Sequence, residues 1–120
     1  MRELLRFDSP VQYTGRRVTT ELTLHGQHLK RGDSVVALIG AANRDPEQFE
    51  RPNELMLARS NNRHLALGLG IHQCAGMSLA RLEGRIAIGR FLQRFPHYRL
   101  SAPPTRGGRA RFRGFLSAPF

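Results

Sequence analysis

The sequence predicts an α+β chain, in which short β strands precede one long helix and a β hairpin ends the chain. Three observations support this prediction. Hydrophobic and polar residues alternate between positions 18 and 24, as in a half-buried strand. Hydrophobic residues recur every three to five positions between 79 and 95, as in an amphipathic helix. Between these two segments, residues 42–62 show no sustained period.

The chain begins with a segment that predicts the last turns of a helix, residues 1–7. We expect this helix to end before Pro10, because the residue that precedes a proline avoids the helical region. The β strands are then expected within residues 16–40, and the alternating strand at 18–24 is the clearest of them.

Two turns divide this β region. The pair His25-Gly26 predicts the first turn, and residues 27–30 predict a short partner strand after it. Residues 31–33 predict the second turn. Residues 35–39 then predict a buried strand, because β-branched residues dominate them.

The second half contains an irregular stretch, a glycine-rich loop and the long helix. Proline and asparagine punctuate residues 42–63, and an irregular stretch of this length in a compact domain is typically functional. The glycine-rich loop covers residues 64–76. Residues 76–95 predict a helix of about five turns. The segments 98–100 and 111–117 predict a β hairpin in the tail, which runs to position 120.

Length and composition limit the class of protein. The chain has 120 residues, enough for one small domain or part of a larger one, and 40% of them are hydrophobic, which excludes a wholly disordered chain. The longest run of apolar residues and glycine, 35–42, is too short to cross a bilayer. The first 20 residues lack the apolar block of a secretory signal. We therefore expect a cytoplasmic protein with no membrane partner.

The charge is strongly positive, with 19 Lys and Arg residues against 9 Asp and Glu residues and a net charge of +10. A field of this sign favours anionic partners, although scattered arginines are commonly a solvated surface. The single cysteine, Cys74, excludes an internal disulfide and a zinc site built from several thiolates. A lone cysteine is either a small buried hydrophobe or a ligand or nucleophile.

The surroundings of Cys74 suit a reactive or ligating sulfur. Gly68, Gly70 and Gly76 permit backbone angles and close approaches that larger residues forbid. Cys74 directly precedes the predicted long helix, where the helix dipole and free amide groups stabilise a thiolate. A flat apolar ligand could lie against this surface, and His72 lies two residues from the sulfur.

This loop resembles the heme-binding loop of the cytochrome P-450 family, whose pattern is Phe-x-x-Gly-x-x-x-Cys-x-Gly. Here Gly70, Cys74 and Gly76 occupy the matching positions, and Leu67 replaces the phenylalanine. Other segments resemble the family in the same order and extend the resemblance over essentially the whole chain: Glu3-Leu4-Leu5-Arg6, residues 42–52, 79–83, 94–96 and 113–119. The fold implied is the C-terminal portion of the mostly α-helical cytochrome P-450 fold, with 42–63 as its meander.

The resemblance implies that the chain binds heme b through a thiolate. Cys74 would be the axial ligand of the heme iron, and His72 and Arg16 would hold the heme propionates, with Arg17 as the alternative if the register shifts by one residue. The same resemblance assigns the remaining heme contacts to Leu67, Gly68, Ile71, Gly76 and Ala80. Because leucine is smaller than the usual phenylalanine, we expect a more exposed thiolate and a shifted redox potential.

Glu3 and Arg6 match the family's structural Glu-x-x-Arg pair, and residues three apart share a helix face. The family often adds an arginine from the meander to this pair. Glu54 occupies the aligned position in this chain, so we expect Arg51 or Arg59 to take that role.

The activity implied is that of a heme-thiolate monooxygenase, which inserts one atom of O2 into a small organic substrate. Its electrons would come from a donor protein such as a ferredoxin with its reductase, and Arg63, Arg81 and Arg85 are candidates for that contact. The family's distal oxygen-activating residues have no match here, so no catalytic residue is assigned. We therefore expect a fragment that is not a competent monooxygenase alone, and its substrate stays unassigned.

Three other readings remain open. The chain could be an inactive heme-binding remnant with the same site. It could be a basic nucleic-acid-binding module, although the aromatic residues are not interleaved with its arginine cluster, Arg106, Arg109, Arg111 and Arg113. A thiol enzyme that uses Cys74 and His72 is the least favoured, because residues two apart on a glycine loop are poorly placed as nucleophile and base.

Overall fold

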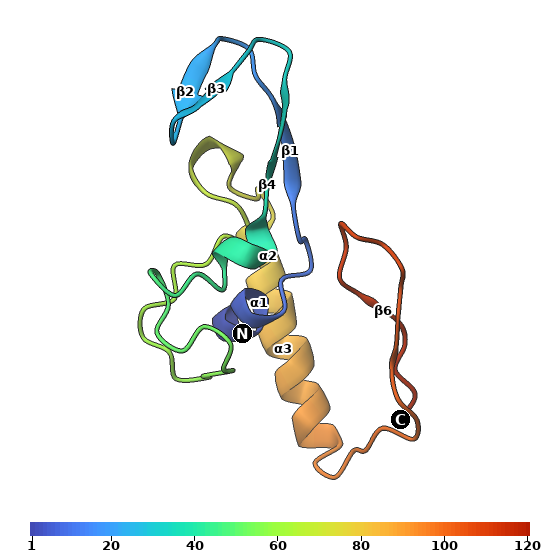
Figure 1. Cartoon of the computed structure of the whole chain (residues 1–120). Helices are drawn as coiled ribbons and strands as arrows, with labels where there is room; N and C mark the ends of the chain where they lie inside the picture. Colours follow the sequence, from blue (N-terminus) through green and yellow to red (C-terminus); the bar gives the residue numbers. More distant parts are fainter.

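The computed structural model describes residues 1–120 and measures 55 × 32 × 28 Å along its principal axes. Figure 1 shows strands β1 to β4 at one end, helix α3 along the middle and the tail beside that helix. The helices are α1 (Arg2–Phe7), α2 (Ile39–Ala42), the 3-10 turn η1 (Gly70–His72) and α3 (Met77–Arg94). The strands are β1 (Thr14–Arg17), β2 (Leu22–Leu24), β3 (Gln27–Leu29), β4 (Ser34–Ala37), β5 (Thr105–Arg106) and β6 (Phe115–Ser117).

The strands form three separate two-stranded sheets. Strand β1 pairs with β4 in antiparallel register, from Thr14 opposite Ala37 to Arg17 opposite Ser34. Strands β2 and β3 form a hairpin around His25 and Gly26, whose φ angles of 48° and 78° are those of a tight two-residue turn. The sequence prediction of this turn and of the partner strand after it is therefore confirmed.

The single strand predicted at 18–24 is wrong, because the chain changes partner within it. β1 ends at Arg17 and β2 begins at Leu22. Between them, the Val18 amide donates to the Asp33 carbonyl at 2.9 Å, which closes the β1–β4 ladder before the hairpin begins. Alternation alone could not show this change of partner.

The strand predicted at 35–39 also differs from the structure. β4 ends at Ala37, and Ile39 already belongs to α2. The strand is not buried, since Val36 is 53% exposed. The segment 98–100 forms no strand, and the tail pairs β5 with β6 instead.

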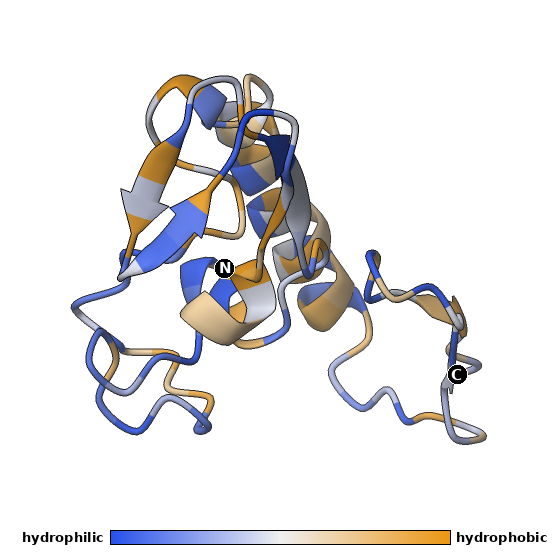
Figure 2. Cartoon of the chain, turned by 45° about the horizontal axis from the view of Figure 1, so that its top comes forward, coloured by the Kyte–Doolittle hydropathy of each residue, from blue (hydrophilic) through white to orange (hydrophobic).

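The predicted long helix is confirmed as α3, an 18-residue helix that ends before Pro96. Hydrophobic and hydrophilic residues both occur along this helix (Figure 2). Its hydrophobic residues are largely open to solvent, with Leu79 59% exposed and Ile86 45% exposed. At its C-terminal end, the Phe91 ring lies 5.1 Å from the Tyr98 ring and 5.9 Å from the Phe120 ring, which fixes the start and the end of the tail to the helix.

The tail is also joined to the segment that follows α1. The Asp8 carboxylate accepts a hydrogen bond from Arg106 at 3.0 Å, and its Oδ1 forms an ion pair with Arg113 Nε at 2.7 Å. Val11 and Phe112 form an antiparallel bridge beside these ion pairs. These contacts place the tail next to the residues that lead into β1.

The buried centre is mostly polar. Nine of the 120 residues are buried, and only Val18, Phe49 and Ala66 among them are hydrophobic. The buried polar residues are Glu3, Arg6, Ser9, Asn43, Asn62 and His64. Specific hydrogen bonds, rather than a large apolar core, therefore hold α1 and the irregular stretch together. No helix is long and apolar enough to cross a membrane.

Candidate functional site

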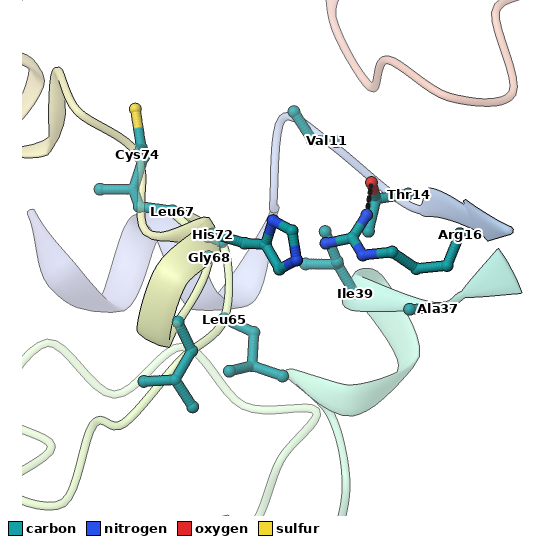
Figure 3. A pocket seen from close by; sticks show the side chains of 12 residues that line it. Val11, Thr14, Arg16, Ala37, Ile39, Leu65, Leu67, Gly68, His72 and Cys74 are labelled. Atoms are coloured by element: carbon teal, nitrogen blue, oxygen red, sulfur yellow. Dashed lines mark hydrogen bonds between the residues drawn. The ribbon is translucent and has the colours of Figure 1, made fainter. Parts of the chain in front are cut away.

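A cavity of about 440 Å³ lies between the β1–β4 sheet and the loop that carries Cys74. Figure 3 shows the Cys74 sulfur on one side of the view and the His72 imidazole directed toward Arg16 on the other side. The cavity is lined mostly by hydrophobic residues from three segments: Val11, Thr14 and Arg16; Ala37 and Ile39; and Leu65, Ala66, Leu67, Gly68, Leu69, His72 and Cys74. A thiol and two nitrogen-bearing groups therefore face one apolar space.

Glycine geometry shapes the cysteine loop. Gly68 has a φ angle of 73°, and a Cβ atom there would collide with the carbonyl oxygen of His72. This close approach lets the loop fold back on itself, so that the Cys74 amide donates to the Leu67 carbonyl at 2.8 Å. The sequence-based expectation that Gly68 permits a close backbone approach is confirmed.

Cys74 is exposed and lies just before α3. The Met77 amide donates to its carbonyl at 3.1 Å, which joins the loop to the first turn of the helix. This arrangement leaves the sulfur accessible to a ligand.

The structure distinguishes the two candidate arginines. Arg16 lines the cavity, where its Nη1 donates to the Thr14 hydroxyl at 3.0 Å and to the Gly15 carbonyl at 2.8 Å. Arg17 does not line the cavity, and its Nη1 donates to the Gly32 carbonyl at 3.1 Å. Because adjacent residues of a strand point to opposite faces, Arg16 lines the cavity together with His72 and Arg17 does not.

Five of the eight residues predicted to contact a heme line this cavity: Arg16, Leu67, Gly68, His72 and Cys74. The other three do not. Ile71 is 96% exposed in the η1 turn, and Ala80 lies on α3 beyond the loop. A Cβ atom on Gly76 would lie 3.9 Å from the Cys74 sulfur, so Gly76 lies beside the sulfur without lining the cavity.

Ala37 and Ile39 line the cavity, and the sequence analysis assigned them only to a strand. The signal that could have identified them is the pairing of β1 with β4. Ala37 lies opposite Thr14, which also lines the cavity. The loop residues Leu65, Ala66 and Leu69 were likewise not singled out, because a hydrophobic run does not show which side faces a ligand.

A buried ion pair between Glu3 and Arg6 is connected to the cysteine loop by hydrogen bonds. Arg6 donates to both Glu3 oxygens, at 2.8 and 2.7 Å, and the side chain of Glu3 is only 3% exposed. Arg6 also donates to the carbonyls of Asn43, Pro52 and Glu54, at 2.8, 2.8 and 3.0 Å. The hydrogen bonds from Arg6 lower the pKa of the Glu3 carboxyl to about 2, against the opposing effect of its burial.

Arg59, rather than Arg51, is the third member of this cluster. Its Nε lies 3.1 Å from both Glu3 oxygens, and its side chain is 6% exposed. Arg51 forms a surface ion pair with Glu54 at 3.2 Å. The structure thus decides between the two alternatives that the sequence left open.

Asn43 connects the buried cluster to the cysteine loop. Its carbonyl accepts from Arg6, and its side-chain oxygen accepts from the Leu65 amide at 2.7 Å. Leu65 lines the cavity. The position of the cavity wall therefore depends on hydrogen bonds that begin at α1.

His64 begins the loop as a buried neutral base. Its Nδ1 accepts from the Ala66 amide at 3.2 Å. Burial, together with the nearby positive charge of Arg81, lowers the pKa of its imidazole.

Comparison with known proteins shows which family has a similar sequence and fold. The sequence model of the cytochrome P-450 family matches residues 1–115. The chain is 50% identical over 103 residues to the polyketide biosynthesis cytochrome P-450 PksS of Bacillus subtilis. This alignment covers 85% of the present chain and 25% of PksS. It is 41% identical over 118 residues to a putative cytochrome P-450 140 of Mycobacterium tuberculosis. This alignment covers 98% of the present chain and 27% of that protein.

Solved structures contain a region with the same fold as this chain. P450BioI in complex with an acyl carrier protein that carries hexadec-9Z-enoic acid superposes with a TM-score of 0.92 at 41% identity. The match covers 96% of this chain and 30% of the P450BioI chain. The chain therefore spans about a quarter to a third of the length of the relatives it matches.

Proposed function

The chain belongs to the cytochrome P-450 family, and from that premise we propose that its cavity would hold heme b, with Cys74 as the residue that would ligate the iron. The observation that carries the proposal is that Cys74, His72 and Arg16 line one cavity whose other walls are mostly apolar (Figure 3). A heme group requires a ligand for its iron, hydrogen-bond donors for its propionates and apolar contacts for its porphyrin ring.

The residues present fit such a group. Arg16 has a guanidinium at the cavity, and a guanidinium suits a carboxylate because it donates parallel hydrogen bonds. His72 offers a second nitrogen at the same end. Leu65, Leu67 and Ile39 supply apolar walls, and Gly68 lets the loop approach closely where a side chain would collide.

Each residue has a separate task in this proposal. Cys74 would ligate the iron through its sulfur at the start of α3. Leu67 lines the same cavity as Cys74 and would limit the contact of the iron-bound sulfur with water. The Glu3–Arg6–Arg59 cluster holds the loop in place through Asn43. Heme bound through a thiolate supplies the oxygen-activating chemistry, because the sulfur donates electron density that favours cleavage of the O–O bond.

We propose that this portion serves a monooxygenase that acts on a small organic substrate and receives electrons from a donor protein. The cationic side chains Arg63, Arg81 and Arg85 flank the cysteine loop and the start of α3, and they suit an acidic donor surface. Donor binding should weaken steeply as salt rises. Binding that is insensitive to salt would contradict this part of the proposal.

The heme proposal is tested by adding hemin to the purified chain, reducing it and recording the carbon monoxide difference spectrum. The expected result is a strongly red-shifted Soret band that Cys74→Ala abolishes, because the alanine side chain cannot ligate iron. Ser78→Ala, a change of similar size at an exposed position that does not line the cavity, is the matched control and should keep the band. A wild-type chain without this band, or an equal band in Cys74→Ala, would refute ligation by Cys74.

A further inference from the structure

The tail is hydrogen-bonded to a segment that forms part of the cavity wall. The Arg113 amide donates to the Pro10 carbonyl at 2.8 Å, and the Gln12 amide donates to the Arg111 carbonyl at 2.8 Å. Val11 lies between these two bonds, in an antiparallel bridge with the tail, and it lines the cavity. We call the two bonds and this bridge the tail contact. One residue of the wall is therefore held on both sides by the other end of the chain.

Gln12 extends the tail contact to a second part of the wall. Its carbonyl accepts from the Gly40 amide at 2.9 Å. A Cβ atom on Gly40 would collide with the Gln12 side chain, so the two segments approach closely. Ile39, the residue before Gly40, also lines the cavity (Figure 3). The tail is thus linked through Gln12 to both Val11 and Ile39.

Asp8 is the only carboxylate that pairs with the arginines of the tail. Residues 84–120 contain eight arginines and no Asp or Glu, so these arginines have no carboxylate side chain of their own segment to pair with. Arg106 and Arg113 each form an ion pair with Asp8, at 3.0 and 2.7 Å. Asp8 lies two residues before Pro10, where the tail contact begins. The ionic and the backbone contacts therefore hold the tail at the same place.

The attachment of the tail at this place is weak. The side chains of Asp8, Arg106 and Arg113 are 34%, 40% and 45% exposed. Ion pairs that water reaches contribute little singly and are screened by salt. Phe112, the tail residue opposite Val11, is itself 48% exposed, so apolar burial adds little. The loss of one carboxylate should therefore change how often the tail is attached.

We propose that Asp8 is a positioning residue for the cavity: it holds the tail against residues 10–12, and the tail contact sets the position of Val11 and Ile39 in the wall. A detached tail removes both hydrogen bonds that flank Val11. Tail attachment and binding in the cavity are therefore coupled, and each strengthens the other. This coupling rests on the function proposed above, because heme is the ligand expected in the cavity.

The first test needs no heme and uses the unliganded full chain. It measures hydrogen exchange at the Arg113 and Gln12 amides and the methyl signals of Val11 and Ile39 in ¹H–¹³C spectra. Asp8→Asn should speed the exchange of both amides about fivefold, as expected for the loss of two partly exposed ion pairs. It should also shift both methyl signals. Faster exchange without methyl shifts, or no change in exchange, would overturn the proposal.

Two further variants separate the ion pair from a general loss of charge. Glu83→Gln removes the charge of an exposed carboxylate that forms no ion pair, so it should leave exchange and methyl signals unchanged. Arg113→Gln should repeat the effects of Asp8→Asn, whereas Arg113→Lys keeps the charge and should largely restore both readouts. Equal effects of the two Arg113 variants would show that its charge does not hold the tail.

The second test is a hemin titration followed at the Soret band. Asp8→Asn should bind hemin about two- to fivefold more weakly, because the variant lowers the apparent affinity only as far as it lowers the population of the attached tail. Hemin should in turn slow exchange at the Arg113 amide of the unchanged chain. Equal hemin affinity of both chains would overturn the coupling. An unchanged chain that binds no hemin would contradict the proposed function instead, and the methyl signals would still decide the role of Asp8.

Discussion

Replacement of Glu3 by glutamine is expected to destabilise the chain more than the loss of any surface carboxylate. Glu3 is 3% exposed and accepts hydrogen bonds from Arg6, Arg59, Asn62 and the Met56 amide. Glutamine has a similar shape but leaves two buried guanidinium groups without a counter-charge. Removal of one partner of a buried ion pair costs about 3–5 kcal/mol of the free energy of unfolding.

The pH dependence gives an independent measure of the same interaction. The folded state lowers the pKa of Glu3 from 4.5 to about 2, which corresponds to about 3 kcal/mol of stabilisation. Because the pKa is lower in the folded state, this stabilisation is complete above pH 4.5 and is lost as the pH falls toward 2. Both magnitudes refer to the same cluster of Glu3 with its arginines.

Urea denaturation between pH 2 and 7 measures both effects. The unchanged chain should lose stability as the pH falls through this window, whereas Glu3→Gln should start lower and change less. Glu21→Gln is the control, because the Glu21 side chain is 64% exposed and should contribute little. Equal pH dependence in the unchanged chain and in Glu3→Gln below pH 4.5 would refute the assignment.

The remaining predictions concern the third arginine and the cysteine loop. Arg59→Gln should cost about 3–5 kcal/mol of the free energy of unfolding, whereas Arg51→Gln, at a half-exposed surface pair, should cost about 0.3–0.5 kcal/mol; similar urea midpoints for both variants would contradict the structure. Gly68→Ala should abolish the thiolate-type spectrum with hemin, because its Cβ collides with the next turn of the loop, whereas Gly108→Ala has open space and should keep it. Leu67→Phe should slow alkylation of the Cys74 thiol by covering it and should shift the reduction potential of the heme-loaded protein; an unchanged rate and potential would show that residue 67 does not shield the sulfur.

The local features of the fold could be predicted from the sequence because their causes are local. A two-residue turn depends on His25-Gly26 and the strands beside it, and the cysteine loop depends on glycines within nine residues of one another. The helix α3 follows from the spacing of its own side chains. Five of the eight predicted heme contacts line one cavity, because the loop carries most of them on a short stretch of chain.

The features that failed or stayed open depend on contacts between distant segments. The strand predicted at 18–24 is interrupted because β1 pairs with β4 and β2 with β3, a choice that alternation does not encode. The choice between Arg51 and Arg59 depends on which one reaches Glu3, more than 45 positions away in both cases. Only the three-dimensional path of the meander brings Arg59 to that carboxylate.

The buried polar groups around Glu3 find their partners within the chain, whereas much of the hydrophobic surface stays exposed. The ion cluster at Glu3 closes entirely within residues 1–65, with every oxygen of that carboxylate paired. Many large hydrophobic side chains stay exposed, and the total accessible area is 9496 Å², whereas a folded protein of this mass exposes about 6,500 Å². The excess, about 3,000 Å², lies on one chain and is several times the ~800 Å² that each partner contributes to an interface of standard size. The chain therefore specifies the geometry of its cysteine loop through its own hydrogen bonds, while hydrophobic stabilisation on the scale of a normal domain requires contacts that cover α3 and the strands.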